Sequence, residues 1–270
     1  MTQDQKLILL YETAMKYLYE IKPDAINDEE MARYFFIKKC NSKAEILERM
    51  LFALSEHSYA SIINYNKRKD AFREIFLNYD ANAILSSYTP ETLLNRFAER
   101  LAINIERPNS IFSKYAKTVI DTCKFINGFA NENDFDKHVQ PYLSSVEDQI
   151  RLADQIASAI YNCGFTLACN ALKDLGYIEY AKPDTHIISI LHTFSLCDNK
   201  PKSAFRIILE MARAVGDTPF NVDRIFWMIG SGDFYLHETK VKTKNAFISR
   251  AKALLEQKRL CPIFVPCFML

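Results

Sequence analysis

The chain has 270 residues, of which 49% are hydrophobic and 25% charged, as is ordinary for a globular protein of one large or two small domains. Its 34 basic and 33 acidic residues give a formal net charge of +1, which excludes a uniformly basic nucleic-acid-binding protein and confines any such surface to a local patch. Seven cysteines, an odd number at irregular spacings, argue against the disulfide framework of a secreted protein and favour the reducing cytoplasm.

Helical periodicity dominates the chain from its start. Apolar residues recur at three- and four-residue intervals from Leu7 to Leu18, the pattern by which an amphipathic helix buries one face. The same pattern returns from Ala44 to Leu54, behind a predicted cap at Asn41 or Ser42. Further helices are predicted over 68–79, 90–104, 113–128, 144–162, 165–176, 185–197, 201–215, 219–229 and 244–259.

The remaining patterns exclude other architectures. No two-residue alternation is long enough for a sheet, so the predicted fold class is all-α. Residues 106–109 and 131–135 are predicted as short polar loops, and Gly230-Ser231-Gly232 as the end of a helix, since no phosphate-loop Lys follows it. The longest apolar stretches fall well short of the roughly 18 residues of a membrane-spanning helix, so we expect no membrane association.

One spacing suggests a binding site. Gly164 lies in a short turn ahead of a predicted helix, and Asp184 follows twenty residues later, at the start of the next one. A turn that opens a helix can hold a phosphate on its backbone amides. A carboxylate one helix and one loop later can return beside the same site, so the spacing indicates a phosphate grip with one acid.

Two segments carry a resemblance to a known family: residues 162–168 (Asn-Cys-Gly-Phe-Thr-Leu-Ala) and 184–187 (Asp-Thr-His-Ile). They resemble the helix-hairpin-helix DNA glycosylase superfamily, of the endonuclease III type. The family hairpin reads Leu-Pro-Gly-Val-Gly and its catalytic segment Val-Asp-Thr-His, at the spacing found here. Residues 53–58 and 111–116 are similar to two further family segments, so that the likeness covers roughly 45–195.

The departures from the family pattern limit the chemistry that the resemblance implies. Asn162 replaces the first hairpin Gly, and Asn is the residue other than Gly that most readily accepts a left-handed backbone. The position of the Schiff-base Lys in bifunctional members is Thr166, and Lys173 lies two helical turns away, about 10 Å along the helix. The resemblance therefore implies a glycosylase without lyase activity.

We expect no iron–sulfur cluster, no other cofactor and no metal. Cys261 and Cys267 match the separation of the last two cluster ligands of the family, but Ala251 and Lys258 stand at the two upstream positions. Two thiolates cannot hold a four-iron cluster. The five His are scattered and lack the partners of a zinc site.

The resemblance implies a two-lobed helix-hairpin-helix glycosylase-like fold, with a helical barrel lobe over 35–178 and a second lobe, from 1–34 and 179–270, that completes a cleft. The implied function is that of a monofunctional DNA glycosylase: a DNA N-glycosylase, hence a hydrolase, that takes part in base excision DNA repair. It would flip a damaged or modified base out of double-stranded DNA and hydrolyse its N-glycosidic bond. The implied protein is a monomer, cytoplasmic and nucleoid-associated in a prokaryote.

The residue roles follow the same resemblance. Asp184 is the implied catalytic residue, which activates water and stabilises the sugar cation. The implied DNA contacts are the phosphate-gripping Asn162, Cys163, Gly164 and Thr166, and the duplex-filling His57 and Ile111. Basic residues between 240 and 259 add predicted phosphate contacts at Lys242, Lys244 and Arg250.

Each of these residues also has a structural interpretation. Asp184 fits a simple helix cap, Gly164 a plain turn residue, and His186 a locally bonded side chain. The basic run fits a solvated helix face. Two other functions stay open: a non-catalytic helix-hairpin-helix protein that binds distorted DNA, and an all-helical protein-interaction domain.

Overall fold

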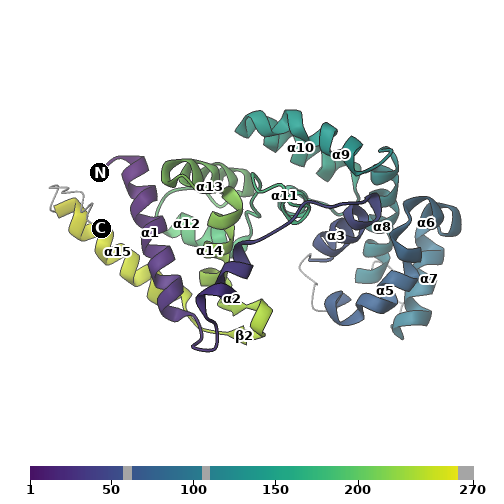
Figure 1. Cartoon of the computed structure of the whole chain (residues 1–270), viewed down its shortest axis with the longest axis horizontal. Coiled ribbons are helices and arrows are strands. Elements are labelled where there is room, and N and C mark those ends of the chain that lie inside the picture. The colour runs from purple at the N-terminus through teal and green to yellow at the C-terminus, as the bar shows by residue number, and fades with distance from the viewer. Residues whose placement is uncertain (57–62, 105–109, 261–270) are drawn as a thin grey trace. The chain divides into compact units, whose positions relative to one another are not determined.

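The computed structural model describes residues 1–56, 63–104 and 110–260, and these are predominantly helical (Figure 1). The predicted all-α class is confirmed. The described strands, β1 (Asp233–Phe234) and β2 (Thr239–Lys240), form one antiparallel pair of two residues each. Among the described residues no helix is long and apolar enough to cross a membrane.

The chain divides into two compact units. Unit 1 comprises Met1–Phe36 and the chain from Pro183 onward, and unit 2 comprises Ile37–Lys182. For comparison, the glycosylase resemblance predicts boundaries after residues 34 and 178. Asp184 therefore belongs to unit 1 and the turn at Gly164 to unit 2.

Unit 2 is built around a central helix, α3 (Lys43–Ser55), which packs on α8 (Ile111–Asn127) and α11 (Phe165–Asp174). Its core contains stacked and edge-on aromatic rings, with Phe72, Phe76 and Phe97 fully buried. The other elements of the unit are η2 (Asn66–Arg68), α5 (Lys69–Ile75), η3 (Leu77–Tyr79), α6 (Ala81–Ser87), α7 (Pro90–Leu101), α9 (Glu132–Val139), η4 (Gln140–Ser144) and α10 (Val146–Ala159).

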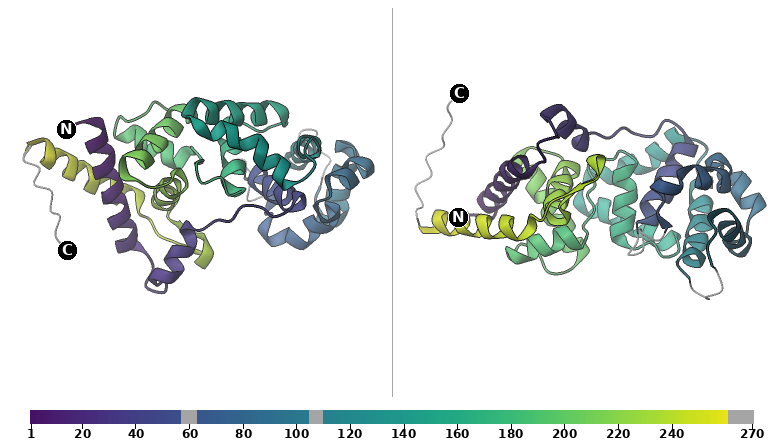
Figure 2. Two further views of the ribbon diagram at one scale, coloured as in Figure 1. Left: turned by 45° about the horizontal axis from the view of Figure 1, so that its top comes forward. Right: turned by 90° about the horizontal axis from the view of Figure 1, so that it is seen from below.

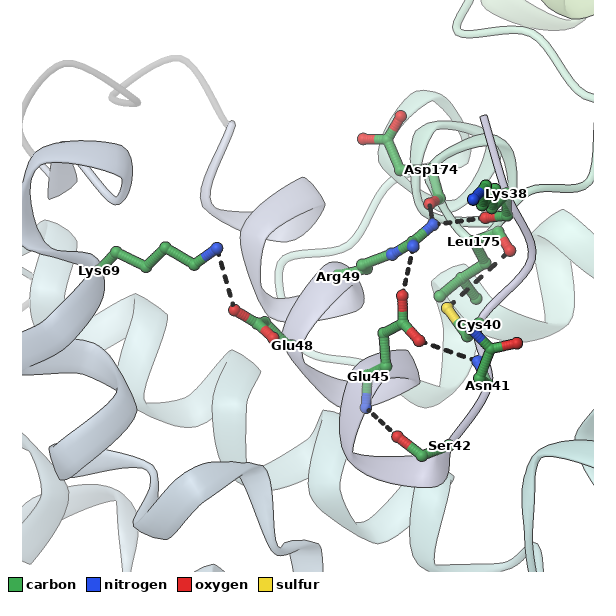
Figure 3. A network of polar contacts seen from close by, with 10 residues as sticks. All are labelled: Lys38, Cys40, Asn41, Ser42, Glu45, Glu48, Arg49, Lys69, Asp174 and Leu175. Carbon is green, nitrogen blue, oxygen red and sulfur yellow. Dashed lines mark hydrogen bonds and ion pairs between the residues drawn. The ribbon is translucent and has the colours of Figure 1, made fainter. Parts of the chain in front are cut away.

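A polar network fastens the first residues of unit 2 to the end of α11 (Figure 3). The Arg49 guanidinium on α3 donates to the carbonyl oxygens of Lys38, at 2.6 Å, and Asp174, at 3.2 Å. It also forms an ion pair with Glu45, one turn earlier on the same helix. The extended segment ahead of α3 is thereby held against α11, the helix that begins after Gly164.

In unit 1, helices from the two ends of the chain pack together. Helix α1 (Gln3–Ile21) lies beside α15 (Lys244–Leu260) in both Figure 1 and Figure 2, and it also contacts α13 (Pro201–Val215) and α14 (Pro219–Ser231). Helix α12 (Thr185–Thr193), which begins after Asp184, packs on α14. The short elements are α2 (Asp28–Ala32), η1 (Arg33–Phe35) and η5 (Tyr235–His237).

Local signals account for the helix boundaries. Ser42 is the cap of α3, its hydroxyl accepting from the Glu45 amide at 3.1 Å, which settles the choice between Asn41 and Ser42. Pro201 begins α13, where its missing N–H costs nothing. Gly232 ends α14 at φ +69°, confirming the predicted helix end at Gly230-Ser231-Gly232.

Three expectations about the elements are wrong. Residues 131–135, expected to be a loop, contain the Asn131 cap and first turn of α9. The helix expected over 68–79 ends at Ile75, because three residues from Leu77 to Tyr79 have positive φ and the break buries Tyr79. Helix α6 has no predicted counterpart, and the loop expected at 106–109 lies outside the described residues.

Candidate nucleic-acid interface

The turn between α10 and α11 contains one residue with a left-handed backbone. Asn162 adopts φ +59°, the left-handed region that Asn accepts, and Gly164 is the exposed N-cap residue of α11. A Cβ on Gly164 would meet no atom within 4 Å. Within the described part of the chain, the backbone N–H groups of Asn162 and Gly164 donate to no acceptor. The turn thus presents two open amides beside a helix N-terminus.

Helix α8 holds this turn in place. The Thr118 hydroxyl donates to the Tyr161 carbonyl at 2.9 Å, and the Tyr161 amide donates to an Asp121 carboxylate oxygen at 3.3 Å. The Lys117 ammonium lies 5.3 Å from the centroid of the Tyr161 ring, a cation–π distance. Tyr161, in place of the family's hairpin Pro, is therefore fastened at its backbone and its ring.

Two of the predicted DNA contacts lie together beside the turn. Ile111, the first residue of α8, and Asn162 line one small surface depression, with Lys114 also on its wall. Among the residues that the structure describes, neither Lys114 nor Lys117 has a carboxylate partner. These two cations, absent from the sequence-based prediction, add positive charge to the turn's surroundings.

Cys163 and Thr166 fit the predicted phosphate grip less well. The Cys163 side chain is buried, which raises the pKa of its thiol to about 12, and its amide donates to the Ile160 carbonyl at 3.2 Å. Cys163 therefore packs the turn from inside and has no open amide. Thr166 is half-buried in the first turn of α11.

Asp184 is the N-cap of α12. Its Oδ1 atom accepts from the amides of His186, at 2.9 Å, and Ile187, at 3.1 Å, and the residue is half-buried. A carboxylate at this place also lies at the positive end of the helix dipole. His186 Nδ1 lies 3.1 Å from the Gly230 carbonyl oxygen. This contact agrees with the alternative in which the His186 side chain has a structural role and forms a local hydrogen bond.

A polar stripe follows Thr166 along α11. Asn170 and Lys173, one and two turns further, are 1% and 3% exposed in an otherwise apolar interface with α3. Lys173 pairs with Asp174 at 3.5 Å, and Asn170 Nδ2 donates to Glu56 Oε2 at 3.1 Å. The Lys173 side chain is thus enclosed within unit 2 beside α3, and its ammonium group is not presented at the surface of α11.

Glu56 and Lys182 are polar site residues that the sequence-based reasoning did not select. Lys182 Nζ lies 2.7 Å from Glu56 Oε2, and their side chains are 14% and 33% exposed respectively. The sequence offered two signals for this pair. Glu56 is a charged residue directly after the apolar end of α3, and Lys182 is a charged residue directly before Pro183.

The three predicted phosphate contacts near the C-terminus differ in their engagement. Arg250 forms an ion pair with Glu20, which raises the pKa of the guanidinium and lowers that of the Glu20 carboxyl. Lys244 donates to the Ser189 hydroxyl at 2.7 Å. Lys242 is exposed and has no partner within the described ranges. Of the three, Lys242 is the cation available to a phosphate.

Some predicted residues cannot be placed. His57, Cys261 and Cys267 lie outside the described residues. In the ranges that are described, no group of three or more His, Cys, Asp or Glu side chains could hold a metal ion.

Comparison with known proteins finds no matching family model, curated protein or solved structure. The resemblance at residues 162–168 and 184–187 therefore stays a prediction.

Proposed function

We propose that this protein is a monofunctional DNA glycosylase, with a helix-hairpin-helix glycosylase-like fold, that acts on double-stranded DNA containing a damaged or modified base. The observation that supports the proposal best is the turn before α11. It combines a left-handed Asn162, an exposed Gly164 with open space at its Cβ position, and two amides that have no acceptor among the described residues. Backbone amides at a helix N-terminus are a general device for holding a phosphate.

The chemistry requires one well-placed carboxylate. The target nucleotide leaves the base stack at a cost of a few kcal/mol. As the glycosidic C–N bond breaks, its electron pair leaves with the base and positive charge develops on the sugar, which the Asp184 carboxylate stabilises. A water molecule then forms the new C–O bond at the same carbon and passes its proton to that carboxylate.

The residues at the family's lyase position support hydrolysis alone. Thr166 carries no amine, and Lys173 on the same face of α11 is buried and paired with Asp174. An amine has to reach the sugar carbon in order to attack it, and a side chain that is 3% exposed does not present its amine to DNA. The expected product is an intact abasic site.

Replacing Asp184 by Asn tests the proposal. Asn is as good an N-cap as Asp, so Asp184→Asn keeps α12 while removing the charge. We expect base release to fall by about 10²–10³-fold or more with DNA affinity unchanged. The measurement is alkali-dependent cleavage of a panel of duplexes, each with one altered base.

The chain offers a matched control in Asp80. It caps α6 in the same way, with Oδ1 accepting from the Asn82 amide at 2.9 Å and the Ala83 amide at 3.1 Å. Asp80→Asn should leave base release at the wild-type rate. Full activity of Asp184→Asn would refute the catalytic assignment.

The alternative is a helix-hairpin-helix protein that binds distorted DNA without chemistry. The cap geometry favours this alternative, because the two hydrogen bonds that Asp184 Oδ1 accepts from backbone amides explain this residue without any catalytic role. The same duplex panel distinguishes the two: this alternative binds a distorted duplex but yields no abasic site with any of them.

A further inference from the structure

Glu56 links three segments of unit 2. It is the C-cap residue of α3, and its Oε2 atom accepts from Asn170 Nδ2 of α11 at 3.1 Å and from Lys182 Nζ at 2.7 Å. Lys182 is the last residue of unit 2. One carboxylate oxygen therefore joins the end of α3, the middle of α11 and the point at which the chain leaves the unit.

The burial of the group makes these bonds consequential. Asn170 is 1% exposed and the Lys182 side chain 14%. A buried amide or ammonium is costly unless it is hydrogen-bonded or paired, so removal of Glu56 leaves two polar groups with a lost acceptor in a poorly hydrated place. The position of the Lys182 side chain is accordingly restrained by its partners.

The restraint lies next to Asp184 in the chain. Only Pro183 separates the two residues, so the Cα atom of Asp184 lies within about 7 Å of that of Lys182. Pro183 is itself buried. Its ring fixes φ and confines Lys182 to extended conformations, which makes the connection short and stiff.

We propose that Glu56 is a positioning residue for Asp184: by holding Lys182 through an ion pair, it fixes the point from which the chain runs through Pro183 into the α12 cap. The assignment of Asp184 as the reacting carboxylate rests on the proposed function. In this role Glu56 acts on Asp184 through Lys182 and not by direct contact. A displacement of about 1 Å at a reacting group can lower the rate about a hundredfold. A shift of this size at Asp184, caused by loss of the ion pair two residues earlier, would therefore be measurable in the rate of base release.

Four variants test the proposal: Glu56→Gln, Lys182→Met, the charge-swapped pair Glu56→Lys with Lys182→Glu, and Lys39→Met as control. Lys39 also pairs with a carboxylate of unit 2, Asp136, at 2.5 Å, but it lies far along the chain from Asp184. The swapped pair retains the attraction, and the Asn170 amide can turn its oxygen toward the new Lys.

Two readouts are taken from each variant. In single-turnover base release, Glu56→Gln and Lys182→Met should slow the chemical step about tenfold or more with DNA affinity unchanged, whereas the swapped pair recovers part of the rate and Lys39→Met keeps all of it. In hydrogen exchange, the amides of His186 and Ile187, which Asp184 caps, should exchange faster in Glu56→Gln and Lys182→Met than in Lys39→Met.

The readouts separate this proposal from the proposed function. Wild-type rate and exchange in both single variants would overturn the positioning role, and so would an equal loss in Lys39→Met. If the wild-type protein releases no base from any duplex, the glycosylase proposal fails, and the exchange data decide alone: unchanged exchange at His186 and Ile187 overturns the restraint, and faster exchange supports it.

Discussion

Asn162 shows how a residue other than Gly can form a left-handed turn. A left-handed backbone costs most residues roughly 1–2 kcal/mol, but Asn adopts it routinely as a single residue. At φ +59° it gives the backbone the direction that a Gly would, and its own amide stays open. The turn therefore depends on conformational tolerance at this position, and an Asn here is compatible with the proposed phosphate contact.

Gly230 allows the helix that follows Asp184 to approach α14. A Cβ at this position would lie 2.9 Å from the His186 Cβ and 3.3 Å from Ile190 Cδ1, both on α12. We expect Gly230→Ala to destabilise the protein, because overpacking costs roughly 1–3 kcal/mol and outweighs the gain in helix propensity of about 1 kcal/mol. The measurement is the urea midpoint of unfolding.

Gly164 provides the contrast for this prediction. Its φ is −90° and a Cβ there would meet no atom within 4 Å, so Gly164→Ala should lower stability by less than about 1 kcal/mol, the difference between two N-cap residues. An unfolding midpoint for Gly230→Ala at or above that of the wild type would show that α12 and α14 separate without cost.

At the scale of the elements, several helices begin with an ionised carboxylate that accepts from a neighbouring donor. The pKa of Glu30 is lowered by the Asn27 amide, that of Glu45 by the Asn41 amide, and that of Asp148 by the Ser145 hydroxyl. Each folded-state pKa lies below the unfolded one. The stability they add is therefore complete above the ordinary pKa range of carboxyl groups and is lost as the pH falls through the lower, folded-state values.

Acid titration of stability checks this expectation. The urea midpoint should be flat from neutral pH down to the ordinary pKa range of carboxyl groups and should fall at more acidic pH. Glu45→Gln keeps an acceptor for the Asn41 amide but cannot titrate, so its midpoint should fall less steeply over that range. An identical acid slope in the variant and the wild type would contradict the contribution of Glu45.

The same local signals explain which parts of the fold were predictable. The helix predicted over 201–215 coincides with α13, because a Pro at its start, a strong apolar stripe and a terminal Gly216 all point the same way. Helix α9 is short and polar at its start, so that its cap and first turn were predicted as a loop, and α6, which has only seven residues, has no predicted counterpart. The helix end after Ile75 could not be predicted, because no Gly or Pro stands near it in the sequence.

In the candidate site, too, local features could be predicted from the sequence and contacts between distant residues could not. The turn at Asn162 and the cap at Asp184 are local features, which residue type and spacing can predict. The Glu56–Lys182 pair joins residues 126 positions apart, and the Lys117–Tyr161 contact joins two elements. Neither contact follows from periodicity, because each depends on how helices pack.

At the scale of the whole molecule, a net charge of +1 provides little long-range attraction to DNA, so the DNA affinity that the proposed function requires would have to come from local cations. The turn has two of these in Lys114 and Lys117, and the segment before α15 has Lys242. Arg250 is neutralised by Glu20 in the free protein, so a phosphate contact there would first have to break an ion pair.

The salt dependence of binding distinguishes these cations. Each phosphate neutralised on duplex DNA contributes about 0.9 to the slope of log affinity against log salt concentration. We expect Lys242→Ala to lower that slope by about 0.9, and Arg250→Ala to lower it by less. Lys16→Ala, which removes an exposed cation on α1, should leave it unchanged. A slope that falls in Arg250→Ala but not in Lys242→Ala would mean that the Glu20–Arg250 pair opens on DNA and that Lys242 stays in solvent.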